Sequence, residues 1–583
     1  MPRQQMESLE VRALMSATLD NGNLVITGTE QADDIIVQPF GSRHVVVNVN
    51  GDETFFRTFF VNKITVNALG GDDRVELQVA RQSFISGGAG IDTLIGGSGS
   101  DTIDGDQGND QVFGNKGNDT LVWDPGDGSD FFEGGKGFDN FLFNGSDGAE
   151  VMAATANGNR VTFTRNLGNI VMDVGSAEKM TVIAKGGADQ ITVNNLAGTS
   201  IQQVVIDAGA GDDVLNGGNL AEILLGGEGN DTIDGNQGND SMLGDAGDDL
   251  LIWDPGDGSD LVVGGVGNDR LLFNGSNGDE VFTATAVAKF NRTIFTRDLG
   301  NIVMDVRSTE TLDLEAKGGA DTVTINDQTV SAVRTVNVDL ESATDSNTPD
   351  DKADEVTVTG TRFADTITAA GPAAGPAAIT GLSATVNVKG ASADLDELTI
   401  DGLAGNDTID AAAVAAGTFR VVNLYGGLGN DSVKGSAGVD IMSGAEGNDL
   451  LDGQQGNDSA WLGSGDDTFV WDPGDGSDLV EGQKGTDTLR FNGSGGAENM
   501  TVTPNGARFT FFRNLGNITM DMGTTEKVDV FAAGGDDTIL VGNLVGTGLA
   551  SVFADGGEGN DTLDLRNDAG VAVTNQNVEN VLQ

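Results

Sequence analysis

The chain has 583 residues, enough for several ordinary domains, but only 38% are hydrophobic and 5% aromatic, which is lean for large conventional cores. Its 90 acidic residues against 31 Lys and Arg give a formal net charge of -59, which argues against nucleic acid as a partner and favours bound cations. Cysteine is absent and His44 is the single histidine, so disulfides and thiolate sites are excluded and little room is left for zinc. Carboxylate and carbonyl oxygens select hard ions such as Ca²⁺.

The first part of the chain predicts a short leader followed by a β-module. Residues 1–18 are typical of a targeting segment, although charged residues interrupt its apolar positions and make it a poor secretory signal core. Residues 19–84 predict a β-module, in which the apolar run 45–47 indicates a strand and His44 is expected to be structural. No apolar run approaches the roughly 18 residues of a membrane helix, so no transmembrane segment is predicted.

A nine-residue unit, Gly-Gly-x-Gly-x-Asp-x-φ-x with φ apolar, repeats within residues 85–145, 208–275 and 403–493 and returns once near the end of the chain. Its sixth position marks the register and is Asp everywhere except at Glu222, whose longer side chain is expected to leave its turn weak or empty. We predict the register aspartates as metal ligands: Asp92, Asp101, Asp110, Asp119, Asp130, Asp139, Asp213, Asp231, Asp240, Asp249, Asp260, Asp269, Asp431, Asp440, Asp449, Asp458, Asp467, Asp478, Asp487 and Asp561.

The eighth position of each unit is apolar, and this distinguishes the repeats from a disordered acidic spacer, the alternative interpretation of the composition. A spacer has no reason to keep an apolar side chain at a constant distance from each aspartate. In the first block these residues are Leu94, Ile103, Val112, Leu121, Phe132 and Phe141.

Each block carries the same insertion, Trp-Asp-Pro-Gly-Asp-Gly-Ser-Asp, at 123–130, 253–260 and 471–478. It superficially resembles an EF-hand loop, but the glutamate expected at the twelfth loop position is absent, so we interpret it as another turn of the repeat. The tryptophans that open it are expected to pack over a bulge, with a sugar-stacking platform as the alternative. These tryptophans are Trp123, Trp253 and Trp471.

The connectors between blocks are repeated too. The motif Phe-Thr-Arg-Asn-Leu-Gly-Asn-Ile at 163–170, with close copies at 295–302 and 511–518, predicts strand-turn-strand units. Its arginine is interpreted as a solvated turn residue, with clasping of an anionic polysaccharide as the alternative. These arginines are Arg165, Arg297 and Arg513.

Other connector elements indicate larger coils and loops. A Gly-Gly-x-Asp element recurs, and Asp189, Asp407 and Asp537 each precede a register aspartate by 24 residues, which suggests a larger solenoid coil. Residues 339–354 and 369–378 predict loops, and 411–416 is the one stretch with helical character.

The spacing of the unit explains why it suits calcium. Two units form one coil of about 18 residues, so units two apart stack directly. Stacked strands lie ~4.8 Å apart and Ca²⁺ holds oxygens at ~2.4 Å, so one ion between adjacent turns can contact both. Glycines let backbone carbonyls turn toward the ion. Without it, neighbouring carboxylates repel by ~1 kcal/mol per pair in water and by more when buried, so metal binding is expected to contribute folding energy.

The units resemble the hemolysin-type (RTX) calcium-binding repeats of secreted bacterial proteins, and the segment Glu7 to Met15 is similar to the LEPR-type segment of many surface proteins, with Val11 in place of the usual proline. The resemblance implies that the sixth-position aspartate is the side-chain ligand and that turn glycines supply carbonyls. It also implies export by a type I system that reads an uncleaved C-terminus.

We therefore predict an all-β fold of Ca²⁺-bound parallel β-rolls, a β-solenoid, alternating with β-rich connector modules. The predicted parts are the targeting-like segment 1–18, β-module 19–84, repeat block 85–145, connector 146–207, repeat block 208–275, expanded connector 276–402, repeat block 403–493 and C-terminal module 494–583 with a last repeat.

No zinc-protease motif, nucleophile elbow or second histidine is present, and repeats with connectors occupy nearly all of the chain. The sequence therefore predicts a non-enzymatic, calcium-stabilised secreted or cell-surface protein with a structural or adhesive role. Its expected partners are calcium ions together with an extracellular polysaccharide or a cell surface. The alternative is a secreted β-solenoid enzyme that acts on acidic polysaccharide.

Overall fold

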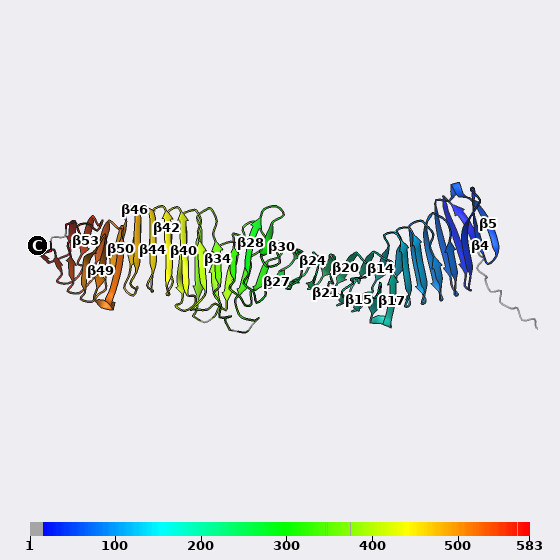
Figure 1. Ribbon diagram of the computed structural model, residues 1–583, viewed down its shortest axis with the longest axis horizontal. Helices are drawn as coiled ribbons and strands as arrows, with labels where there is room; N and C mark the ends of the chain where they lie inside the picture. Colours follow the sequence, from blue (N-terminus) through cyan, green and yellow to red (C-terminus); the bar gives the residue numbers. More distant parts are fainter. Residues whose placement is uncertain (1–15, 344–345, 347, 374, 568–569) are drawn as a thin grey trace, which may run out of the picture. The chain divides into compact units, whose positions relative to one another are not determined.

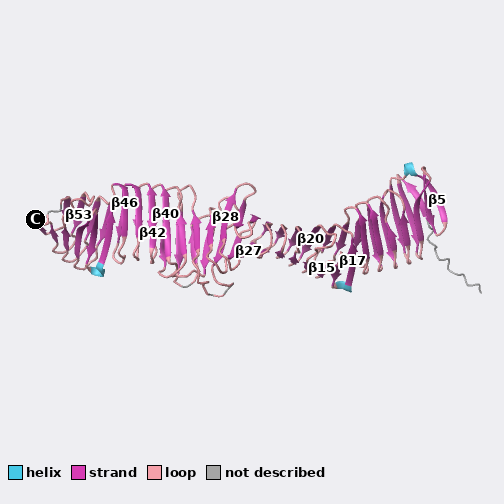
Figure 2. Cartoon of the chain, viewed as in Figure 1, coloured by secondary structure: helices cyan, strands magenta, loops and turns pink. Residues whose placement is uncertain are grey.

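The computed structural model describes residues 16–343, 346, 348–373, 375–567 and 570–583. Within these ranges the protein is all-β, with strands, loops and the short 3₁₀ turns η1 (Thr58–Phe60), η2 (Leu167–Asn169) and η3 (Leu515–Asn517), but no α-helix (Figure 2). The predicted fold class is thus confirmed. The chain forms two compact units, residues 1–271 and 272–583. The LEPR-like segment lies outside the described residues.

In the first unit the chain alternates between two sheets, which Figure 1 shows as successive rungs. One sheet contains β1 (Ser16–Asp20), β2 (Asn23–Thr29), β6 (Lys63–Leu69), β8 (Gln82–Ala89), β10 (Asp101–Gln107), β12 (Thr120–Trp123), β14 (Asn140–Asn144), β18 (Lys179–Ile183), β20 (Gln203–Ala210), β22 (Glu222–Glu228), β24 (Ser241–Ala246) and β26 (Leu261–Val266). The other contains β5 (Asp52–Arg57), β4 (His44–Val49), β3 (Asp34–Phe40), β7 (Arg74–Leu77), β9 (Thr93–Ile95), β11 (Gln111–Lys116), β13 (Phe131–Lys136), β17 (Ile170–Gly175), β16 (Arg160–Arg165), β15 (Val151–Asn157), β19 (Gln190–Val193), β21 (Val214–Asn216), β23 (Thr232–Asp234) and β25 (Leu250–Trp253).

The second unit has the same alternation, and β27 (Arg270–Asn274) lies at the division between the units. Its first sheet contains β30 (Ile302–Arg307), β29 (Arg292–Arg297), β28 (Val281–Val287), β32 (Thr322–Ile325), β34 (Glu355–Thr359), β38 (Glu397–Asp401), β40 (Val421–Leu428), β42 (Asp440–Glu446), β44 (Ser459–Gly465), β46 (Leu479–Gly485), β50 (Ile518–Gly523), β49 (Arg508–Arg513), β48 (Asn499–Asn505), β52 (Thr538–Val541), β54 (Thr562–Asp564) and β56 (Asn580–Leu582). Its second sheet contains β31 (Thr311–Glu315), β33 (Thr335–Asp339), β37 (Thr385–Lys389), β36 (Ala377–Thr380), β35 (Thr366–Gly371), β39 (Thr408–Val414), β41 (Ser432–Lys434), β43 (Leu450–Asp452), β45 (Thr468–Trp471), β47 (Thr488–Asn492), β51 (Lys527–Phe531), β53 (Ser551–Asp555) and β55 (Ala572–Gln576).

Strands of the repeat blocks are parallel, and those not separated by the insertion are 18 residues apart, as two units require. Ile85, Ile103 and Leu121 lie side by side on β8, β10 and β12, and Asp92 and Asp110 are 18 residues apart. Units two apart therefore stack directly, as the periodicity predicts. Every position of the unit consequently forms a row that runs from coil to coil.

The Arg-containing connectors form the predicted strand-turn-strand units. In the first unit β16 lies between β15 and β17 and is antiparallel to both, while β17 pairs in parallel with β13 and β15 pairs in parallel with β19. β48, β49 and β50 repeat this arrangement in the second unit. Each such insert adds strands to one sheet without interrupting the stacking of the coils.

The apolar eighth positions form the core, because alternate strand residues point inward. In the first block Leu94, Ile103, Val112 and Leu121 are fully buried. Every tryptophan of the insertions is buried as well. Trp123 stacks on Phe143 with ring centroids 4.2 Å apart, and its indole N–H donates to the carbonyl of Gly128 at 2.9 Å. The tryptophans therefore pack inside the coil, and the sugar-stacking alternative is wrong.

Two local predictions are corrected. The stretch 411–416 is not helical: β39 covers most of it, because Ile409 and Ala411 alternate into the core and β39 pairs in parallel with β41. Residues 369–378 are not all loop, since β35 and β36 enter this stretch and pair with each other in antiparallel fashion. Alanine-rich sequence takes the conformation that the neighbouring strands impose.

Candidate metal centre

Register aspartates of successive coils are joined by hydrogen bonds into rows, which we term carboxylate ladders. The backbone N–H of Asp92 donates to Oδ1 of Asp110 at 2.7 Å, and the N–H of Asp110 donates to Oδ1 of Asp130 at 2.8 Å. In a second ladder the N–H of Asp101 donates to Oδ1 of Asp119, and the N–H of Asp119 donates to Oδ1 of Asp139, both at 2.8 Å. In-register stacking thus places each carboxylate against the turn of the preceding coil.

The other predicted ligands occupy equivalent ladders. One is the second ladder, whose last aspartate is Asp139, and the others run through Asp213, Asp231, Asp249 and Asp269; Glu222, Asp240 and Asp260; Asp431, Asp449, Asp467 and Asp487; Asp440, Asp458 and Asp478; and Asp537 and Asp561. Sequence register alone therefore placed them correctly in relation to one another.

The second oxygen of most ladder carboxylates is buried and, among the described residues, accepts no hydrogen bond. Because a buried carboxylate oxygen without a partner is costly, such a row requires a positive charge or a proton. The register residues with this unpartnered Oδ2 are Asp92, Asp110, Asp119, Asp139, Asp213, Asp231, Asp240, Asp249, Asp431, Asp449, Asp458, Asp467, Asp478, Asp487 and Asp561.

The first-position glycine of the unit keeps open the space beside this oxygen. A Cβ added at Gly114 would lie 2.5 Å from Oδ2 of Asp119 and 2.6 Å from the carbonyl oxygen of Gly134 in the next coil. No side chain fits there, whereas both oxygens are ligands that Ca²⁺ prefers. An unpartnered carboxylate oxygen, a bare glycine and a carbonyl of the next coil together fit a hard cation.

Electrostatics supports this reading. Burial, reinforced by repulsion from Asp130 and Asp92, raises the pKa of Asp110 to about 8. Burial, reinforced by repulsion from Asp440 and Asp478, raises the pKa of Asp458 to about 9. Both shifts mean that the ionised ladder is unfavourable without a counter-ion.

Within the described residues no group of three or more acidic or histidine side chains is arranged to hold an ion. A cation here would therefore take much of its coordination from backbone carbonyls, which hard divalent ions accept readily.

Not every predicted ligand combines an unpartnered Oδ2 with a glycine at the first position of its unit. Asp101 and Asp440 have no open Oδ2, because the N–H groups of Gly97 and Ser436 donate to these oxygens at 2.8 and 2.6 Å. Other register aspartates lack the first-position glycine, since Pro, Ala or Leu stands there; they are Asp130, Asp213, Asp260, Asp467 and Asp478.

The register aspartates with both the unpartnered Oδ2 and the glycine are Asp92, Asp110, Asp119, Asp139, Asp231, Asp240, Asp249, Asp431, Asp449, Asp458, Asp487 and Asp561. Glu222 keeps its place in the ladder, with its N–H on Oδ1 of Asp240 at 2.7 Å, and one of its carboxylate oxygens accepts from the N–H of Leu220 at 3.0 Å. Its weak or empty turn stays a prediction.

Sequence reasoning missed members of the ladders that lie outside the nine-residue register. Asp407 has both features: its Oδ2 is unpartnered among the described residues and lies 2.8 Å from a Cβ added at Gly402. Its N–H donates to Oδ1 of Asp431, 24 residues on. Asp73 and Asp189 extend ladders in the same way. For Asp407 and Asp189 the sequence did carry a signal, because each precedes a register aspartate by 24 residues.

The connector arginines are not solvated, and the alternative of an exposed clasp for polysaccharide is also contradicted. The side chains of Arg165, Arg297 and Arg513 are only 8, 6 and 8% exposed. Each forms an ion pair with a fully buried glutamate. Both interpretations assumed a guanidinium in solvent, and the fold places it inside the coil.

A family model described as the RTX calcium-binding nonapeptide repeat matches residues 86–121, 204–221, 216–251, 256–271, 399–413, 423–451 and 443–470. These segments are RTX calcium-binding nonapeptide repeats. RTX nonapeptide repeats bind Ca²⁺, and the matched segments contain many of the ladder aspartates, among them Asp92, Asp110 and Asp119. No curated protein matches the chain. In the part of the chain that the structure describes, no helix has the length and apolarity needed to cross a bilayer.

Proposed function

We propose that the protein is a secreted or cell-surface scaffold with a structural or adhesive role, that calcium holds its RTX rolls together, and that it catalyses no reaction. The observation that carries this proposal is the series of buried carboxylate oxygens that accept no hydrogen bond among the described residues, most of them beside a bare glycine. Such a series is stable when cations fill it and unstable when it is empty.

The residues that would hold the ion follow from that observation. In the turn of Asp119, the ligands would be Oδ2 of Asp119 and the carbonyl of Gly134, and the absence of a side chain at Gly114 leaves room for the ion between them. Bound Ca²⁺ supplies positive charge between coils. Each thin coil buries few apolar side chains, so this charge contributes a large share of the folding free energy.

A dependence of this kind suits a protein that folds after export. Extracellular calcium sites are tuned to roughly millimolar affinity, so the rolls would stay unfolded at low intracellular calcium and fold outside the cell. A chain of formal charge -59 also repels itself until cations bind.

A calcium titration from chelator-treated protein, followed by circular dichroism, tests the proposal. We expect a cooperative gain of β signal with Ca²⁺ and much less with Mg²⁺, which retains its waters and demands an octahedral site. The same ordered, heat-resistant protein in excess EDTA would refute it. Incubation of the calcium-loaded protein with alginate or pectin tests the enzymatic alternative, because release of shorter chains would favour an enzyme and binding without cleavage would favour adhesion.

A further inference from the structure

Three connector turns outside the matched repeats follow a variant of the same unit, in which glutamate stands at the sixth position. They read Gly-Ser-x-Gly-x-Glu, at 145–150, 275–280 and 493–498. Their eighth positions are apolar and buried, as in an RTX turn; these residues are Met152, Phe282 and Met500. Each is followed by the buried arginine of the next strand-turn-strand unit.

The glutamate occupies the place of a ladder aspartate. The backbone N–H of Glu150 donates to Oδ1 of Asp189 at 2.7 Å. A Cβ added at Gly145 would lie 2.7 Å from Oε2 of Glu150 and 2.7 Å from the carbonyl oxygen of Ala184 in the next coil. The turn therefore keeps the carboxylate, the glycine and the facing carbonyl of a metal-binding turn.

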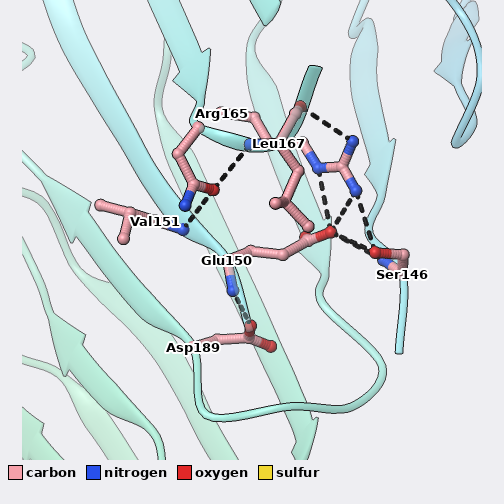
Figure 3. A network of polar contacts seen from close by, with 7 residues as sticks. Ser146, Glu150, Val151, Arg165, Leu167 and Asp189 are labelled. Atoms are coloured by element: carbon pink, nitrogen blue, oxygen red, sulfur yellow. Dashed lines mark hydrogen bonds and ion pairs between the residues drawn. The ribbon is translucent and has the colours of Figure 1, made fainter. Parts of the chain in front are cut away.

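What differs is the charge that faces the carboxylate. Figure 3 shows that the Arg165 guanidinium lies against Oε1 of Glu150 and also donates to the Ser146 hydroxyl at 2.9 Å and to the carbonyl of Leu167 at 3.2 Å. Its other neighbour is Trp123, with the guanidinium carbon 5.3 Å from the ring centroid. The tryptophan of the insertion and the arginine of the connector thus form one buried group.

The second and third turns repeat these contacts. Arg513 pairs with Glu498, donates to the Ser494 hydroxyl at 3.0 Å and to the carbonyl of Leu515 at 3.1 Å, and lies 5.2 Å from the ring of Trp471. Arg297 pairs with Glu280 and donates to the Ser276 hydroxyl at 3.2 Å.

Since the proposed function makes calcium the counter-ion of the ladders, we infer that in these three turns a guanidinium of the chain itself replaces the ion. The buried carboxylates of Glu150, Glu280 and Glu498 are then neutralised without metal, and the strand-turn-strand inserts remain ordered when the rolls lose calcium. Arginine suits this role because it is always charged and its planar fork matches a carboxylate.

The replacement leaves a latent metal site. Oε2 of Glu150 and Oε2 of Glu498 accept no hydrogen bond among the described residues, although both side chains are buried. Removal of the arginine therefore leaves an acidic turn with an open oxygen, a bare glycine and a carbonyl, which is the arrangement of an RTX turn. Such a variant is expected to need calcium where the wild-type turn does not.

Hydrogen exchange on the full chain, with and without EDTA, tests the inference. In wild type we expect amides of β15–β17 and β48–β50 to stay protected in EDTA, while amides of β9–β11 lose protection. In Arg165→Met, exchange of β15–β17 in EDTA should accelerate by about a hundredfold or more, as expected when one partner of a buried ion pair is removed. Millimolar calcium should restore most of that protection.

The chain supplies its own controls. The intact Arg513 turn reports on the same molecules and should not respond to Arg165→Met. The double variant Glu150→Gln with Arg165→Met removes both charges and should regain protection in EDTA without calcium. Wild-type inserts that lose protection together with the rolls, or an Arg165→Met defect that calcium does not lessen, would overturn the inference. If instead the rolls were protected in EDTA, the proposed function itself would fail.

Discussion

Asp119 and Asp101 belong to one ladder, yet the structure predicts opposite effects when each is replaced by asparagine in the absence of metal. Oδ2 of Asp119 has no partner within the described chain. Asp101 has both oxygens satisfied, by the N–H and hydroxyl of Ser83 at 2.9 and 2.7 Å and by the N–H of Gly97 at 2.8 Å. Asparagine keeps the shape of either side chain but removes its charge.

The magnitudes follow from these environments. Burial, reinforced by repulsion from Asp101 and Asp139, raises the pKa of Asp119 from 3.8 to about 7. A shift of that size corresponds to roughly 4 kcal/mol against the ionised form above pH 7. Asp119→Asn removes up to this cost and should stabilise the metal-free fold. In Asp101→Asn the side-chain NH₂ group replaces Oδ2 and cannot accept the hydrogen bond from the N–H of Gly97. The loss should lower the free energy of unfolding by about 1–3 kcal/mol.

Calcium should reverse the first effect. With metal bound, Asp119→Asn lacks the anionic ligand, so its calcium midpoint should rise above that of wild type. Hydrogen exchange of β10 and β12 measures both states, in EDTA with an osmolyte that favours the folded form and in millimolar calcium. Equal destabilisation by Asp119→Asn in both conditions, or the same sign for Asp119→Asn and Asp101→Asn in EDTA, would refute the reasoning.

Three further predictions follow from the same geometry. Gly114→Ala places a methyl group against Oδ2 of Asp119 and should raise the calcium midpoint without changing charge, whereas Gly148→Ala, whose nearest contact is 3.6 Å away, should not; a titration followed by circular dichroism decides. Burial raises the pKa of Asp110 to about 8, so the metal-free fold binds more protons than the unfolded chain between about pH 4 and 8, and its stability falls as pH rises through that window. Calcium binding near pH 7 should therefore release protons, and calorimetric heats that are identical in buffers of different ionisation enthalpy would contradict this. Trp123→Ala should destabilise its coil by about 3–5 kcal/mol, because the side chain is fully buried, and added oligosaccharide should leave the fluorescence of the wild-type protein unchanged.

Much of the architecture could be predicted from the sequence, because a repeat that buries one apolar residue per unit has few ways to stack. Asp92 and Leu94, and their equivalents in the other units, are separated by the same number of residues along the sequence. This constant spacing indicated parallel coils and identified the ladder residues. The same pattern does not cover Glu150, Glu280 and Glu498, because its sixth position is aspartate and theirs is glutamate. The pattern Gly-Ser-x-Gly-x-Glu was the signal that would have found them.

Sequence by itself determined the period, the register and the chemistry of the ligands, since all three depend on residues within one unit. Tertiary structure alone decided which carboxylates keep an oxygen that accepts no hydrogen bond among the described residues and which form an ion pair with an arginine of the protein. Oδ1 of Asp110 accepts a hydrogen bond from the N–H of Asp92, 18 residues earlier, and Glu150 is neutralised by Arg165, 15 residues later. Such partners come from other strands and coils, and their positions are set only when the chain has wound upon itself.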